Sequence, residues 1–256
     1  MKKSIFPILA LLLIIQSVSC SKEDTAAKSG STKNGSLSRV ISIGNFIYAV
    51  DDNHLITINA GDPANLSIAN NISLGANIQT IYHHNGSLFI GSATQMYVYN
   101  IQNNPAAPSL TSSYIYPVII EPRDPILALD SAIYSTSTSA VGSGVFRVFD
   151  SRDLTNPVLL EENFLQTPRG MDVSGNYLYL CNGRFGICIY SITDPFHPIL
   201  ESIIDENNNL ANGEMGTNDY YDVIAENGQL FCYTKGALLN YNISQPNQPI
   251  FLNKIQ

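Results

Sequence analysis

The chain has 256 residues, of which 45% are hydrophobic and 13% charged, and its formal net charge is −8. This composition provides enough apolar side chains for a sizeable core. The sequence has no cluster of Lys and Arg, and binding to a phosphate backbone requires grouped cations, so nucleic acid is excluded as a partner. The sequence also lacks the HExxH, phosphate-loop, GxSxG and dinucleotide-binding motifs of common enzyme classes.

Residues 1–19 are predicted to be a signal peptide. Lys2 and Lys3 precede an apolar run, Ile5–Ile15, that is too short to span a bilayer. Small residues then precede Cys20, which resembles the lipobox of bacterial lipoproteins, with Ser17 where that family favours Leu. The resemblance implies that Cys20 is acylated and anchors the chain in a membrane. The alternative is an ordinary secretory signal in which Cys20 is incidental.

Residues 20–37 are predicted to be a flexible tether, because Ser21–Ser36 is polar and shows no apolar period. Such a chain reaches about 20–25 Å. The start of this segment, Ser21–Asp24, resembles the export signal of lipoproteins displayed on the cell surface in some Gram-negative groups. We therefore expect a lipid-anchored protein on the surface of a bacterial outer membrane, with retention on the periplasmic side as the alternative.

Five similar units are predicted to follow, at about 38–75, 76–117, 122–165, 168–205 and 219–256. Each contains four short apolar runs and an aromatic residue in its second run. These marker aromatics are Tyr48, Phe89, Tyr134, Tyr179 and Phe231. A period near 40–50 residues with four strands per unit is typical of propeller blades. The sequence therefore predicts an all-β fold, a β-propeller of five four-stranded blades, with a β-sandwich as the alternative.

The fourth unit shows the pattern most clearly. Its predicted strands are Met171–Ser174, Tyr177–Cys181, Ile187–Ile192 and Ile199–Ile204, separated by Gly, Asn, Asp and Pro. This unit, with Gly186-Ile187-Cys188-Ile189-Tyr190 followed by Asp194-Pro195 and Pro198, resembles the LVIVD repeat of secreted and surface bacterial proteins. That repeat is inferred to form β-propellers. The resemblance implies a scaffold and no particular chemistry.

By resemblance to other propellers, the first strand of each unit is expected to line a central channel, and the loops between strands two and three to share one rim with the segments leading into the first strands. The candidate ligand-binding residues on that rim are Gln79, Arg123, Arg169, Arg184, Tyr220 and Lys235, with Arg39 beside them. Grouped cations favour an anionic or polar ligand, such as a glycan or a protein. The alternative is that each arginine pairs with a nearby carboxylate.

Two carboxylates, Asp172 and Asp222, occupy equivalent positions in adjacent first strands. Facing carboxylates perform acid/base chemistry in glycosidases, so a hydrolase or lyase acting on a carbohydrate at the channel mouth is the alternative function. The other interpretation is that these side chains bind backbone amides between blades. Because catalytic motifs are missing, the sequence favours a binding or scaffold protein over an enzyme.

The remaining chemical signals are weaker. Cys181 and Cys188 flank a short connection, which leaves two alternatives, a disulfide in an oxidising compartment or two small buried hydrophobes. Asp205–Asn209 is rich in oxygen ligands, but Leu210 and Gly216 stand where an EF-hand loop needs Gly and a bidentate Glu. Calcium therefore stays a weak alternative, and we predict no cofactor and no metal site.

Overall fold

The computed structural model describes residues 35–75, 77–117, 125–139, 143–207 and 210–256, which all belong to one compact unit, Ser31–Gln256. Twenty strands in these residues form five four-stranded antiparallel sheets, and the predicted five-bladed all-β propeller is confirmed. Within the same ranges, no helix has the length and apolar character needed to cross a bilayer. The predicted signal peptide, the acylation site Cys20 and nearly all of the tether lie outside the described residues.

Each sheet is called a blade here and takes four consecutive strands. Blade 1 consists of β1 (Val40–Ile43), β2 (Phe46–Val50), β3 (His54–Asn59) and β4 (Ser67–Ser73). Blade 2 consists of β5 (Ile78–His84), β6 (Ser87–Ser92), β7 (Gln95–Asn100) and β8 (Ser109–Ile115). Blade 3 consists of β9 (Ile126–Ala128), β10 (Ala132–Thr138), β11 (Gly144–Asp150) and β12 (Val158–Leu165).

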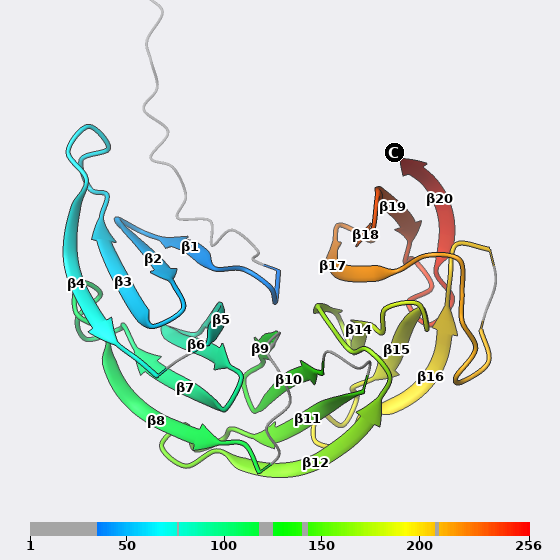
Figure 1. Ribbon diagram of the computed structural model, residues 1–256, viewed down its shortest axis with the longest axis horizontal. Coiled ribbons are helices and arrows are strands. Elements are labelled where there is room, and N and C mark those ends of the chain that lie inside the picture. The colour runs from blue at the N-terminus through cyan, green and yellow to red at the C-terminus, as the bar shows by residue number, and fades with distance from the viewer. Residues whose placement is uncertain (1–34, 76, 118–124, 140–142, 208–209) are drawn as a thin grey trace, which may run out of the picture. The chain divides into compact units, whose positions relative to one another are not determined.

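The last two blades follow the same plan. Blade 4 consists of β13 (Met171–Ser174), β14 (Tyr177–Cys181), β15 (Ile187–Ser191) and β16 (Ile199–Ile204). Blade 5 consists of β17 (Tyr220–Glu226), β18 (Gln229–Thr234), β19 (Ala237–Asn242) and β20 (Ile250–Ile255). In Figure 1 the blades follow one another in chain order, with the first strand of each toward the middle and the fourth on the outside.

Local sequence explains the tight hairpins. In blade 4, Gly175 adopts φ 56° between β13 and β14, a conformation that costs glycine little because it has no Cβ. The predicted strand Ile187–Ile192 ends one residue early, at Ser191, because the N–H of Ile192 turns to the carbonyl of Asn176 (2.8 Å). The other three predicted strands of this blade have the bounds that the sequence indicated.

The core lies between neighbouring blades. Four clusters of buried side chains join blades 1 and 2, blades 2 and 3, blades 3 and 4, and blades 4 and 5. The marker aromatics Tyr48, Phe89, Tyr134 and Tyr179 are at most 2% exposed within these clusters. Because burying a large apolar side chain contributes about 1.5–3 kcal/mol, each blade is stabilised mainly by its neighbours.

A repeated hydrogen bond fastens three of the four pairs of consecutive blades on the outer side, and blades 2 and 3 lack it because the marker residue of blade 2 is Phe89. A marker tyrosine donates its hydroxyl to the carbonyl of a proline in the turn before the fourth strand of the next blade. The three bonds are Tyr48 to Pro105 (2.7 Å), Tyr134 to Pro195 (2.8 Å) and Tyr179 to Pro246 (3.0 Å). Burial raises the pKa of Tyr48 to about 12, so its hydroxyl keeps the proton that it donates.

Candidate ligand-binding rim

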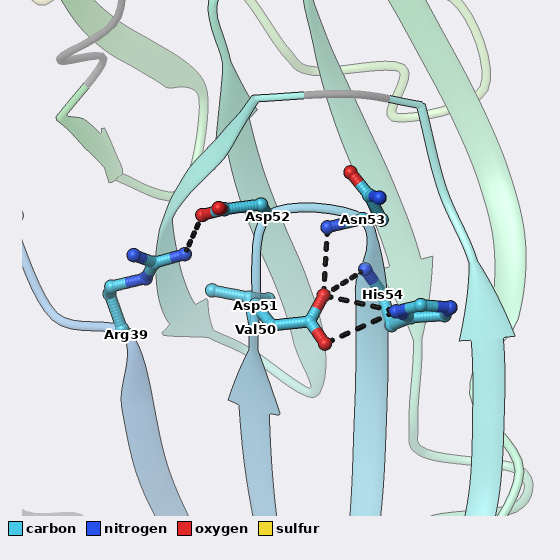
Figure 2. Close-up of a pocket in the computed structure, with 6 residues that line it drawn as sticks. All are labelled: Arg39, Val50, Asp51, Asp52, Asn53 and His54. Atoms are coloured by element: carbon cyan, nitrogen blue, oxygen red, sulfur yellow. Dashed lines mark hydrogen bonds and ion pairs between the residues drawn. The ribbon is translucent and has the colours of Figure 1, made fainter.

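The β2–β3 turn of blade 1 meets Arg39, which precedes β1, and the start of blade 2. The Nη2 atom of Arg39 donates to Oδ1 of Asp52 (2.9 Å) and to the carbonyl of Ile78 (3.1 Å), as the side chains in Figure 2 show for the first of these bonds. The N–H of Ile78 in turn donates to the carbonyl of Asp52 (3.1 Å). The segment leading into β1, the β2–β3 turn and the first strand of blade 2 therefore meet on one rim.

A polar pocket of about 380 Å³ opens on this rim. Its lining residues are Arg39, Val50, Asp51, Asp52, Asn53 and His54 (Figure 2). The side chain of Asp52 is 77% exposed and that of Arg39 is 44% exposed, although the two form an ion pair. The guanidinium of Arg39 and the carboxylate, amide and imidazole groups of the β2–β3 turn therefore line one pocket.

Asp51 sets the shape of this pocket. Its Oδ1 accepts hydrogen bonds from the backbone N–H groups of Asn53 and His54, both at 2.7 Å, and Nδ1 of His54 lies 3.1 Å from the same carboxylate. The bond from Asn53, followed by those from His54, holds the pKa of Asp51 below its usual range. The carboxylate therefore fixes the turn, and the outer groups of Asp52 and Asn53 stay available to a ligand.

The predicted rim residue Arg169 is mostly engaged within the protein. Its Nη1 donates to Oδ1 of Asp219 (2.8 Å) and to the carbonyl of Tyr220 (3.1 Å), and its guanidinium lies 4.0 Å from the ring centroid of Tyr221. Its side chain is 14% exposed. Arg169 and Arg39 each pair with a nearby carboxylate, Asp219 and Asp52 respectively. Both therefore match the alternative in which the arginines form ion pairs within the protein.

Of the other predicted rim residues, Arg184 and Lys235 approach the same segment that Arg169 contacts, whereas Gln79 lies apart from them. Arg184 and Lys235 are exposed, and their backbones bond to Gly216 (2.7 Å) and Asp219 (3.1 Å), which brings both near the segment leading into blade 5. Gln79 is half-buried in β5 of blade 2. Arg123 lies outside the described residues.

The prediction that Tyr220 faces a ligand is wrong. Its side chain is fully buried, and its hydroxyl donates to Oδ1 of Asp205 (2.6 Å) beside the hydroxyl of Tyr241 (2.9 Å). Burial, and then the neighbouring Tyr241, raise the pKa of Tyr220 far above its usual value. Aromatic identity at the start of a strand indicated a rim position, but the sequence does not show that Asp205 lies opposite it.

Asp205 organises the long connection from blade 4 to blade 5. Its carboxylate accepts hydrogen bonds from five donors, which are the N–H of Glu206, the N–H and hydroxyl of Thr217, the amide of Asn218 and the hydroxyl of Tyr220. These donors occupy the lone pairs that a calcium ion would need. Across the described ranges, no group of three or more His, Cys, Asp or Glu side chains is placed to hold a metal ion.

Asp172 lies on β13 near the centre of the fold and is 2% exposed. Its Oδ2 accepts a hydrogen bond from the N–H of Ala225 on β17 (2.7 Å), and its Oδ1 accepts one from Val173 (2.8 Å). Close by, the N–H of Met171 donates to the hydroxyl of Ser36 (2.7 Å), a residue that precedes blade 1 and is fully buried. The carboxylate thus binds backbone amides between blades, which is the non-catalytic interpretation.

The expected equivalence of Asp172 and Asp222 does not hold in the strand register, because Asp172 pairs with the marker Tyr179, whereas Asp222 on β17 pairs with Tyr233. A Cβ atom added to Gly170 would lie 1.9 Å from Oδ1 of Asp222, and one added to Gly35 would lie 2.9 Å from its Oδ2, so backbone crowds both oxygens. Burial, together with nearby Asp172, raises the pKa of Asp222 to about 7. The expected open channel mouth is therefore filled at this point by the lead-in to blade 1 and by Gly170.

Of the two alternatives for Cys181 and Cys188, the structure has the small buried hydrophobes and not the disulfide. Cys181 pairs across the ladder with Ile187, and Cys188 pairs with Leu180, so the two thiols lie on opposite faces of blade 4. They belong to different core clusters, and both are free thiols, as is Cys232. Burial raises the pKa of Cys188 to about 12 and that of Cys181 well above its usual value. These side chains act as small buried hydrophobes.

The sequence interpretation missed the pocket itself. Asp51, Asp52 and Asn53 are consecutive polar residues in a turn, a composition that usually marks nothing more than a loop. Arg39 drew attention because of its charge, but its contact with Asp52 spans 13 residues and depends on the β1–β2–β3 register. The signal that could have located the pocket is the run of Asp and Asn residues in the turn between the second and third predicted strands.

Comparisons with known proteins support the fold. No family model matches the chain, and no curated protein matches it. Among solved structures, it is similar to the computationally designed Ika8 protein (TM-score 0.58, 10% identity, 84% of this chain and 60% of that one). It is also similar to Sqt1 from Saccharomyces cerevisiae (0.56, 14%, 82% and 59%) and to BamB from Moraxella catarrhalis (0.50, 10%, 75% and 54%). The chain spans less than two thirds of each of these longer chains.

Proposed function

We propose that this protein is a binding or scaffold module whose rim pocket in blade 1 recognises a polar ligand. The exposed groups around Asp52 carry the proposal, because Asn53 and His54 beside it and Arg39 before β1 add both donors and acceptors to one pocket. A hydroxyl-rich ligand such as a glycan can satisfy donors and acceptors together. A polar loop on a protein partner is the other ligand of this chemistry.

The arrangement of the central carboxylates favours binding over catalysis. General acid/base hydrolysis needs two carboxyl groups that reach the scissile bond. Asp172 is buried and bonds to Ala225 and Val173, while Gly35 and Gly170 crowd Asp222. A substrate would have to displace these contacts before it could reach either side chain.

The proposed location is the outer-membrane surface, with the propeller held by acylated Cys20 at the end of the 20–37 tether. The signal-like residues 1–19 and the likeness of Ser21–Asp24 to a surface-export signal support this proposal. The spacing of the blades likewise supports membership of the LVIVD-repeat proteins. In this arrangement a short leash presents the rim to ligands just outside the membrane.

The binding test uses the full-length protein in detergent micelles on an array of immobilised neutral and acidic oligosaccharides. We expect binding that falls at least tenfold in Asp52→Ala and in Arg39→Ala. The control is Arg152→Ala in blade 3, which removes another exposed ion pair, with Asp150, outside the pocket. Equal binding by wild type and both pocket variants would contradict the proposed site, and a loss in Arg152→Ala would show a non-specific charge effect.

A further inference from the structure

The two end blades each have one face without a neighbour. Every core cluster in the described residues joins consecutive blades, and none joins blade 5 to blade 1. Figure 1 shows these end blades standing apart. In the interior blades both sheet faces are packed against a neighbouring blade.

Equivalent positions show what blade 5 lacks. The marker aromatics of blades 1 to 4 are buried against the following blade, whereas Phe231, the marker of blade 5, is only half-buried. The cross-strand row of Phe231 contains Ile224, Asn240 and Asn253, and the next row on the same side of the sheet contains Tyr233, Leu238 and Ile255. Tyr233 and Ile255 are among the most exposed apolar residues of the protein.

Blade 1 lacks a neighbour on its opposite side. Its uncovered face has two cross-strand rows, one of Val40, Ala49, Ile56 and Asn71 and one of Ser42, Ile47, Ile58 and Ile68. In blade 2 the positions that correspond to Val40 and Ala49 are Ile81 and Ile90, and both are fully buried against blade 1. Val40, by contrast, is 58% exposed.

We propose that a second copy of this chain covers these faces, with blade 5 of one copy packed on blade 1 of the next. The free face of blade 5 is the side that blades 1 to 4 present to their successors, and the free face of blade 1 is the side that blades 2 to 5 present to their predecessors. The contact between copies therefore continues the interface that already joins consecutive blades. It is head-to-tail, so it generates a closed ring or a longer assembly.

Composition and charge favour a second copy over other occupants. The residues between Cys20 and blade 1 are mostly Ser, Lys, Thr, Ala and Gly, which have little apolar surface to cover an aliphatic sheet face. Six of the eight positions on the blade 1 face are aliphatic and the other two, Ser42 and Asn71, are uncharged, so copies of a chain with net charge −8 meet there without like-charge repulsion. The similar propeller chains are longer than this one, which agrees with room for further blades beside these five.

Two double variants test the proposal by complementation. The blade 1 variant carries Val40→Glu and Ile68→Glu, and the blade 5 variant carries Leu238→Glu and Ile255→Glu, all at exposed positions where folding tolerates a charge. Full-length proteins in excess detergent are measured by light scattering over a concentration series. We expect wild type to form assemblies of two or more copies, and each variant alone to associate at least tenfold more weakly.

Mixing the two variants gives the decisive readout. Each mixture contains one intact blade 5 face and one intact blade 1 face, so we expect 1:1 dimers and nothing larger. The control carries Ile115→Glu and Phe164→Glu, apolar residues on β8 and β12 that are more exposed than the four test positions, and it should assemble like wild type. Three results would each overturn the proposal: wild type that stays monomeric at every concentration, weaker association in only one of the two variants, or no dimer on mixing. Monomeric wild type would indicate that the chain covers its own faces.

Discussion

Oδ2 of Asp172 on β13 accepts a 2.7 Å hydrogen bond from the N–H of Ala225 on β17, and this bond joins the innermost strands of blades 4 and 5. The two strands belong to separate sheets, and the bond stands beside one from the N–H of Gly170 to the carbonyl of Tyr221 (3.0 Å). A side chain that bridges them therefore fixes their spacing at the centre of the fold.

The first prediction concerns this bridge. Asn at position 172 has one acceptor oxygen, so its amide nitrogen faces either the N–H of Ala225 or that of Val173. An unpaired buried donor costs about 1–3 kcal/mol, and we expect Asp172→Asn to lower the free energy of unfolding by that amount. Urea denaturation measures it. Glu201→Gln, at an exposed position on β16, is the control, and equal stability of both variants would contradict the bridging role.

The second prediction concerns pH. The pKa of Asp222 is about 7 in the folded protein, against 3.8 for an exposed aspartate, so between these values the native state binds more protons than the unfolded chain. The free energy of unfolding should therefore fall as pH rises from about 4 to about 7 and stay low above that. Asp222→Asn should remove this fall, and at pH 8 its free energy of unfolding should exceed that of wild type by about 1–3 kcal/mol.

Denaturant titrations at pH 4 and pH 8 check this expectation. The two proteins should have nearly equal stability at pH 4, where the carboxyl of Asp222 is protonated in the folded protein. A wild type and an Asp222→Asn protein with the same pH dependence would show that other groups cause it.

The third prediction compares two arginines that reach across blades. Arg169 is largely buried and combines an ion pair to Asp219 with a contact to the Tyr221 ring, so we expect Arg169→Ala to cost about 2–4 kcal/mol. The Arg39 pair with Asp52 is exposed, so Arg39→Ala should cost less than about 1 kcal/mol. Thermal and urea unfolding of both variants test the order, and the reverse order would disprove it.

The fourth prediction concerns the thiols. Cys181, Cys188 and Cys232 are buried and free, so a thiol reagent should leave them unmodified in the native protein and modify all three after denaturation without reductant. The modified thiols are counted in a Cys20→Ser protein, in which only these three cysteines remain. Two fewer thiols than expected would indicate a disulfide after all.

The fifth prediction concerns the anchor. Cys20→Ser should release the protein from the membrane fraction of a Gram-negative host, because the proposed acyl chains attach at that residue. Mass spectrometry of the N-terminal peptide of wild type should show an acylated cysteine. An unmodified, freely secreted wild type would contradict the lipoprotein proposal.

The sequence predicted the blade plan well because that plan rests on local signals. Apolar runs bounded by Gly175 and Pro195 mark strands and turns over a few residues, and the spacing from Tyr134 to Tyr179 repeats the unit. Contacts between blades were harder to predict. The burial of Tyr220 depends on Asp205, 15 residues earlier, and the pocket depends on register between Arg39 and the β2–β3 turn.

The acceptor in each tyrosine bond between blades is a main-chain carbonyl, and every residue type carries one. Substitutions around Pro105, Pro195 or Pro246 can thus accumulate without removing the acceptor, provided the turn keeps its path. Such tolerance lets repeats drift far apart in composition while their geometry persists. The likeness of this fold to proteins of 10–14% identity agrees with such drift.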